Sequence, residues 1–222
     1  MSSRLLLPAR KVLVALVAAG LVALGGIGTS AAEPLSPAEA TRLEQGQTVV
    51  RPETLTEGEH RYVGGVTYTV LPASTADLDA LFEDVGGWAK VLPRTKRARL
   101  VPSPAEQSEE ARGDRFVELT QGNALVNAVY TIRVRRTGDE VRFWLAPERP
   151  HDIDDAWGYF RFTPFTDEGG EARVLVTYGI LVDVGPGLVR ELFEEKVRSA
   201  MLSVPQLLRR HVTAARRAAL VP

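Results

Sequence analysis

The stretch that decides the fold is TYGILVDVGPGLVRELFEEKVRSAMLSVPQLLRR, residues 177–210. Its first part is strongly apolar and predicts a strand that ends near Asp183. After the turn signal GPG at 185–187, apolar residues recur every three or four positions, which is typical of one long amphipathic helix. Pro205 lies inside that helix and lacks a backbone N–H, so we expect a kink or a restart after Ser203.

Strand and helix signals continue toward the N-terminus. A first strand is expected from His60, because apolar residues and threonines alternate through VTYTV at 66–70. Ser74 and Asp77 form a capping box that begins one short helix, and WAKVLP at 88–93 predicts a second. The remaining strands, whose spacing suits an antiparallel meander, are expected at 95–101, 115–120, 129–135, 141–146, 157–163 and 173–183.

Composition excludes several classes of function. The chain has 222 residues, of which 45% are hydrophobic, and its net charge of −1 gives no electrostatic reason to expect a nucleic-acid partner. It contains no cysteine and only three histidines, which excludes thiolate chemistry and makes a metal cage unexpected. No signature of a serine hydrolase, zinc protease or nucleotide-binding loop is present, so no catalytic residue, metal or cofactor is predicted.

The N-terminus has the pattern of a targeting segment. Residues 1–11 carry basic residues and no acid, and residues 12–32 are uncharged and end in the small residues TSAA. We expect residues 1–32 to be a signal peptide, removed after Ala32 to give an exported protein, either periplasmic or secreted. The alternative is an uncleaved anchor, because about 20 uncharged residues can span a bilayer. Residues 33–58 are expected to form an N-terminal arm with a short helix.

Three stretches together resemble the START-like superfamily (SRPBCC), which includes polyketide cyclase/dehydrase and lipid-transport proteins. They are YTVLPASTADLDALFEDVGGWAKVLPRTKRARLV at 68–101, WGYFRFTPF at 157–165 and the stretch at 177–210. The resemblance implies that residues 59–217 form a ligand-binding domain with the α+β helix-grip fold. In that fold a curved antiparallel β-sheet and two short helices are joined by a long C-terminal helix packed over a cavity. The resemblance implies an apolar small molecule or lipid as ligand, and no particular one.

The faces of the strands indicate which side chains face such a cavity. Apolar rows on the strands at 141–146, 157–163 and 173–183 are predicted to point inward. The opposite rows combine arginine with tryptophan and tyrosine, which cation–π pairing on an outer face explains. The alternative is the opposite register, in which the tryptophans line the pocket. Three tyrosines fall in register with apolar rows, and at least one hydroxyl is expected to bond the ligand's polar group. The predicted ligand-binding residues are Tyr68, Tyr130, Phe143, Phe160, Tyr178 and Met201.

The leading hypothesis is an exported binding or carrier protein for a hydrophobic ligand. One alternative is a cavity enzyme of the polyketide cyclase, dehydratase or hydrolase type, and another is a lipid-interacting accessory domain without turnover. A carrier needs an apolar pocket with a few polar anchors, whereas an enzyme should contain a buried ionisable group with a shifted pKa. Glu118 is the best strand candidate for such a group, but we expect it to face solvent. The protein is expected to be a monomer.

Two charged clusters have a structural and a functional interpretation. The run PHDIDD at 150–155 could bind a divalent cation, but we expect a solvated loop between two strands. A second cluster could contact anionic headgroups of a membrane surface, although a solvated basic patch is the simpler interpretation. Its residues are Lys90, Arg94, Lys96, Arg97 and Arg99.

Overall fold

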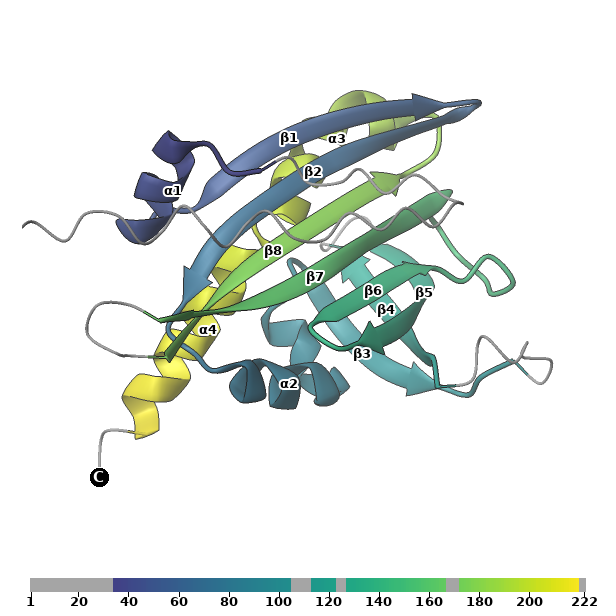
Figure 1. The fold of residues 1–222 in the computed structure, drawn as a ribbon. Coiled ribbons are helices and arrows are strands. Elements are labelled where there is room, and N and C mark those ends of the chain that lie inside the picture. The colour runs from purple at the N-terminus through teal and green to yellow at the C-terminus, as the bar shows by residue number, and fades with distance from the viewer. Residues whose placement is uncertain (1–33, 105–112, 123–126, 167–171, 220–222) are drawn as a thin grey trace, which may run out of the picture. The chain divides into compact units, whose positions relative to one another are not determined.

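The computed structural model describes residues 34–104, 113–122, 127–166 and 172–219 (Figure 1). The predicted signal segment, residues 1–32, lies outside these ranges. No helix of the described ranges has the length and apolar character needed to cross a membrane. The elements belong to the compact unit Pro37–Pro222. In chain order they are α1 (Pro37–Glu44), β1 (Val49–Glu57), β2 (His60–Leu71), α2 (Thr75–Glu83), the 3-10 helix η1 (Val85–Lys90), β3 (Thr95–Val101), β4 (Arg115–Gly122), β5 (Asn127–Thr137), β6 (Glu140–Leu145), β7 (Asp155–Thr166), β8 (Ala172–Asp183), α3 (Leu188–Leu202) and α4 (Val204–Ala219).

The strands form one antiparallel sheet in the order β1-β2-β8-β7-β6-β5-β4-β3. The sheet is curved, and α3 and α4 lie behind it in Figure 1, where both contact β2. We call the face that these helices cover the inner face and the opposite one the outer face. The predicted α+β architecture is confirmed, including the short helix α2, the second short helix η1 and the long C-terminal helical region.

The segment expected as an arm contributes a strand to the sheet. Val49–Glu57 form β1, which pairs with β2 from Val49 opposite Tyr68 to Glu57 opposite His60. Pro52 interrupts the backbone donors of β1, and an edge strand tolerates this because only one of its sides is paired. The sheet therefore begins ten residues earlier than the predicted domain boundary suggests, at Val49 instead of residue 59.

The long C-terminal helix restarts where the sequence predicts. Helix α3 ends at Leu202 and α4 begins at Val204, with Pro205 in its first turn. Pro205 has no N–H, and the N–H of Gln206 bonds the carbonyl oxygen of Ser203 at 3.0 Å instead of continuing the α-helical pattern. A proline-induced break therefore divides one amphipathic pattern into two helices.

The inner and outer faces of β2 are the reverse of what the alternation suggested. Thr67 pairs with Tyr178, and Thr69 with Val176, so the threonines point toward the helices, while Tyr68 lies on the outer face. The Thr67 hydroxyl donates to the carbonyl oxygen of Leu202 at 3.0 Å. This carbonyl lies at the helix break, where the regular helical donor is lost, so the buried threonine satisfies a buried acceptor.

A close approach of strands accompanies the curvature of β2. Gly65 adopts φ +135°, in the region that favours glycine, opposite Pro52 of β1. A Cβ built on Gly64 would lie 1.9 Å from the carbonyl oxygen of Ile180 in β8, which leaves no room for any side chain. The pair Gly64-Gly65 therefore allows β2 to lie against both of its neighbours.

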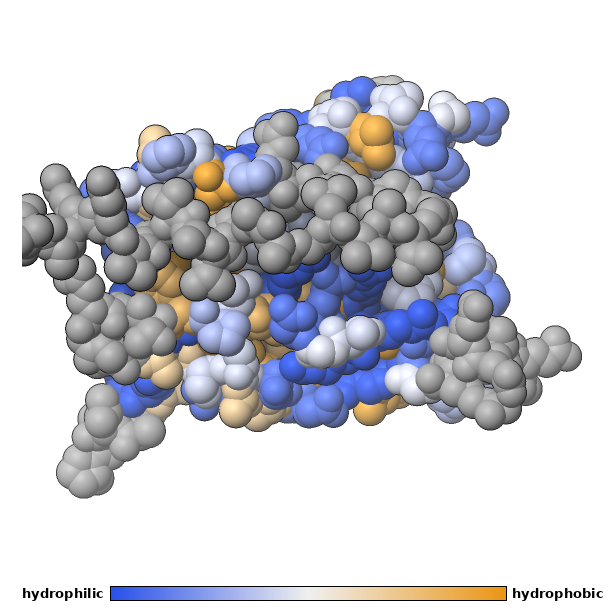
Figure 2. All heavy atoms as spheres, viewed as in Figure 1, coloured by the Kyte–Doolittle hydropathy of each residue, from blue (hydrophilic) through white to orange (hydrophobic). Residues whose placement is uncertain are grey.

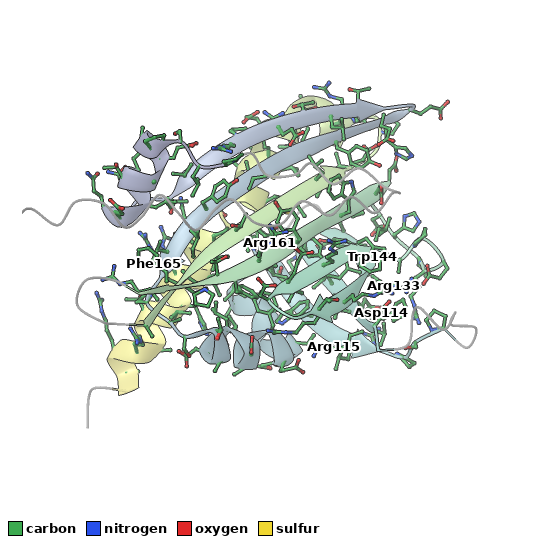
Figure 3. All side chains as sticks on the ribbon, viewed as in Figure 1. Asp114, Arg115, Arg133, Trp144, Arg161 and Phe165 are labelled. Carbon is green, nitrogen blue, oxygen red and sulfur yellow. The ribbon has the colours of Figure 1, made fainter. Side chains whose placement is uncertain are left out.

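The outer face has the predicted stacking of arginine on aromatic rings. The guanidinium carbons of Arg133 and Arg135 lie 5.1 and 5.6 Å from the centre of the Trp144 ring. Hydrophilic side chains gather over the middle of this face in Figure 2. Asp114 lies beside Arg133 and Trp144 in Figure 3, and its carboxylate accepts from Arg133 and, at 2.8 Å, from Arg135.

Asp114 is the buried centre of this cluster, because its side chain is only 1% exposed. Burial raises the pKa of Asp114, but hydrogen bonds from Arg135 and Arg133 outweigh it and hold the pKa below its usual value. The carboxylate is therefore charged and its charge is compensated by the two guanidinium groups.

Candidate ligand-binding cavity

A cavity lies between the inner face of the sheet and the helical elements α2, η1 and α4. The cavity volume is about 70 Å³. The lining comes from the strands β4 to β8 as well as from these helical elements, because the curved sheet brings distant strands around one space. The lining residues are Leu81, Phe82, Trp88, Val91, Leu92, Leu119, Gln121, Tyr130, Ile132, Val134, Val141, Phe143, Ala156, Phe160, Tyr178, Ile180, Val182, Val204 and Leu208.

Four of the six predicted ligand-binding residues line this cavity: Tyr130, Phe143, Phe160 and Tyr178. They come together because their strands are consecutive neighbours in the sheet and their side chains share the inner face. The Phe160 ring lies 4.5 Å from that of Tyr178 and 4.9 Å from that of Phe82, centre to centre. These contacts form an aromatic wall across β7, β8 and α2.

The other two predicted residues lie elsewhere. Tyr68 points to the outer face, where the guanidinium of Arg51 lies 5.3 Å from the centre of its ring. It is buried there, and α1 contacts both β1 and β2. Met201 is partly buried against the hydrophobic core but is not among the residues that line the cavity. The prediction that Tyr68 lines the cavity is therefore wrong, because its side chain lies on the outer face of the sheet.

Several lining residues were missed as site residues. Phe82 lies on the short helix that begins at the predicted capping box, and Trp88 lies in the short helical segment predicted at 88–93, but neither was predicted as a site residue. Their sequence signals identify burial but not the neighbour they face. Val204 and Leu208 follow the restart of the helix, and the apolar stripe of the region could have suggested them.

One polar pair at the cavity is already satisfied internally. The Tyr130 hydroxyl donates to Oε1 of Gln121, and Nε2 of Gln121 donates to Oγ1 of Thr95 at 2.8 Å and to the carbonyl oxygen of Pro93 at 3.3 Å. Burial raises the pKa of Tyr130. The phenol is therefore a protonated donor whose acceptor lies within the protein.

Two other polar groups of the lining have no such partner. Nε1 of Trp88 is buried and meets no hydrogen-bond acceptor among the described residues. The Tyr178 hydroxyl makes no hydrogen bond to any part of the chain that the structure describes. Burial raises the pKa of Tyr178, with a smaller contribution from Tyr130, so this hydroxyl also remains protonated. A buried donor without an acceptor is unfavourable, and a ligand oxygen would relieve it.

The strand glutamate that we considered as an acid or base does not belong to the cavity. Glu118 lies on the outer face, where its carboxylate accepts from Nε of Arg99 at 2.6 Å and from a second nitrogen of the same guanidinium at 2.8 Å. The hydrogen bond from Arg99 lowers the pKa of Glu118. The outward orientation predicted for Glu118 is confirmed.

The acidic run at 150–155 has separate local partners. Nδ1 of His151 lies 2.7 Å from the carbonyl oxygen of Ile153, and Asp152 accepts from the backbone N–H of Val129 at 2.8 Å. Asp155 accepts from the Tyr62 hydroxyl at 2.7 Å. Within the described ranges no group of three histidine or acidic side chains is placed to hold a metal ion.

The basic cluster near η1 and β3 is exposed for the most part, and Nζ of Lys96 bonds Oδ1 of Asn127 at 2.6 Å. Contact between this cluster and a membrane surface stays a prediction, as does the monomeric state.

Comparison with solved structures identifies the fold. A STAR-related lipid transfer protein fragment from Xanthomonas axonopodis matches with a TM-score of 0.53 and 19% identity, over 75% of this chain and 92% of that chain. A START superfamily protein from Mycobacterium smegmatis matches with a TM-score of 0.52 and 12% identity, over 68% of this chain and 97% of the other. A protein from Thermus thermophilus matches with a TM-score of 0.52 and 16% identity, over 68% of this chain and 97% of that chain.

No protein-family model matches the sequence, and a search of curated proteins finds no match. The structural matches nevertheless show that this chain has the START-like helix-grip fold, as the sequence resemblance predicted.

Proposed function

We propose that this protein binds a hydrophobic small molecule or lipid in the cavity and acts as its carrier. The observation that carries the proposal is the lining, in which apolar side chains surround two buried donors, Trp88 and Tyr178, that lack acceptors among the described residues. Such a composition suits an apolar ligand with a polar group. The likeness to a lipid transfer protein supports the same choice.

The carrier hypothesis accounts for the cavity with fewer requirements than the enzyme alternatives. A cyclase, dehydratase or hydrolase needs an acid or base within reach of the substrate. Among the described lining residues, only the phenols of Tyr130 and Tyr178 ionise, and burial raises the pKa of both. No specific observation favours either of those activities, whereas the apolar lining directly supports binding.

Phe143 offers a direct test of ligand binding, because it lines the cavity and is only partly buried. We expect Phe143→Asp to weaken binding of the apolar dye Nile red by about tenfold or more, since a charge in the lining loses its hydration when the dye enters. Binding is measured by the increase in Nile red fluorescence on titration with protein.

The matched control is Arg142→Ala, one residue away on the same strand and pointing to the outer face. It should bind Nile red like the parent, and thermal melting should show that both variants are folded. Equal dye affinity for the parent and Phe143→Asp would contradict the proposed site. Mass spectrometry of protein purified from its own cells distinguishes a carrier, which should contain a lipophilic molecule in stoichiometric amount, from an accessory domain.

We also propose export, on the basis of the basic, uncharged and small-residue order of residues 1–32. The native protein is expected to begin within one or two residues of Glu33 and to occur in the soluble fraction outside the cytoplasm. Intact-mass measurement of native protein gives the terminus, with cytoplasmically expressed full-length chain as the reference mass. Recovery of the full-length chain in the membrane fraction would contradict cleavage and would show that residues 1–32 act as a membrane anchor.

A further inference from the structure

The polar groups of the cavity are unevenly divided between donors and acceptors. The indole Nε1 of Trp88 can only donate, and the Tyr178 hydroxyl is held protonated by burial. The side chain of Gln121, by contrast, already accepts from Tyr130 and donates to Thr95 and Pro93. The groups left for a ligand are therefore two donors that meet no acceptor in the described part of the chain.

The two donors are connected through the aromatic wall. The Trp88 ring lies 6.1 Å from that of Phe82, Phe82 lies 4.9 Å from Phe160, and Phe160 lies 4.5 Å from Tyr178, all between ring centres. The two residues that carry the donors therefore stand at the two ends of this series of rings.

The lining also differs from a charged binding site. Among the lining residues, all within the described ranges, none is an aspartate, glutamate, lysine, arginine or histidine. An anionic head group would lose its hydration without meeting a cation, and an ammonium group would meet no carboxylate. Transfer of an unpaired ion into such surroundings is strongly unfavourable.

We infer that the cavity selects an uncharged apolar molecule that carries an accepting oxygen, such as a ketone or ester carbonyl, bound by Nε1 of Trp88 or the hydroxyl of Tyr178. This inference rests on the proposed function and specifies its ligand class. Fatty acids in their carboxylate form are excluded by the missing cation, and plain hydrocarbons leave both donors without an acceptor.

The test compares two probes that differ in the charged group, methyl decanoate and decanoate, as competitors of bound Nile red. At about pH 8 the acid is ionised. The ester should displace the dye at a concentration at least about tenfold lower than decanoate, since an unpaired carboxylate is strongly disfavoured in the cavity. Decane, which has the apolar body alone, should compete less well than the ester.

Two conservative variants test the donors. Trp88→Phe and Tyr178→Phe keep an aromatic ring and remove the N–H or O–H, and at least one of them should weaken ester binding by about fivefold. The matched controls, Trp157→Phe and Tyr159→Phe, change the outer face and should leave ester binding as in the parent. Each competition constant is corrected for the dye affinity of that variant.

The outcomes separate the two proposals. If Nile red binds but decanoate competes as well as its ester, the ligand class inferred here is wrong and the proposed function stands. If the ester is preferred but neither donor variant affects it, the roles of Trp88 and Tyr178 are wrong. If neither the dye nor the ester binds, the proposed function itself is wrong.

Discussion

Asp114→Ala is expected to lower the free energy of unfolding by about 3–5 kcal/mol, the usual loss when one partner of a buried ion pair is removed. The Asp114 side chain is 1% exposed, and it accepts from both Arg133 and Arg135. Without it, two guanidinium groups remain close together over the Trp144 ring with no compensating charge. Urea denaturation of parent and variant measures the difference.

Glu118→Ala is the matched control for that substitution. Glu118 also lies on the outer face and also accepts from an arginine, Arg99, but the two side chains are 24% and 48% exposed. Its removal should lower the free energy of unfolding by no more than about 1 kcal/mol. Equal losses in the two variants would show that burial does not decide the contribution of Asp114.

Gly64→Ala is expected to lower the free energy of unfolding by about 3 kcal/mol, because overpacking forces the backbone to move. The added Cβ would lie 1.9 Å from the carbonyl oxygen of Ile180 and 2.8 Å from its carbonyl carbon. Both are backbone atoms of β8, so no side-chain rotation relieves the contact. The change is measured by thermal and urea denaturation.

Gly86→Ala adds the same methyl group where space is available. The nearest atom to its Cβ is a carboxylate oxygen of Asp84 at 3.4 Å, an ordinary contact, and Gly86 is exposed. This control should change the free energy of unfolding by no more than about 0.5 kcal/mol. Similar behaviour of the two alanine variants would contradict the close approach of β2 and β8.

The strands and helices could be predicted because their side-chain periodicities are strong, but periodicity does not identify the inner face. In β2 the apolar row that contains Tyr68 suggested an inner face, yet Thr67 and Thr69 occupy it. Threonine is acceptable there because Thr67 bonds the Leu202 carbonyl, a partner created by a helix break more than 130 residues away. No local pattern reveals such a partner.

The edge strand β1 was interpreted as an arm for a related reason. Its sequence VVRPETLTE is largely polar and contains Pro52, features that argue against a central strand. An edge strand is subject to weaker constraints, since one side of its backbone remains unpaired. Its place beside β2 became visible only in the pairing of the two strands.

The cavity residues that could be predicted from the sequence are those on the strands. Tyr130, Phe143, Phe160 and Tyr178 were identified because they alternate with outward residues on paired strands. Trp88 belongs to a six-residue 3-10 helix, which is too short to show a periodic face. The position of Trp88 in the lining depends on how η1 packs over the sheet. The spacing of apolar residues within η1 does not predict that packing.

The break between α3 and α4 has a consequence for protein engineering. Val204 and Leu208 reach the cavity from α4, whereas most other lining residues stand on strands. Exchanges of similar volume at these two helix positions, with an expected loss of less than about 1.5 kcal/mol each, reshape the binding space without altering the strand pairing. A library of variants designed to bind a different ligand should therefore begin with substitutions at Val204 and Leu208.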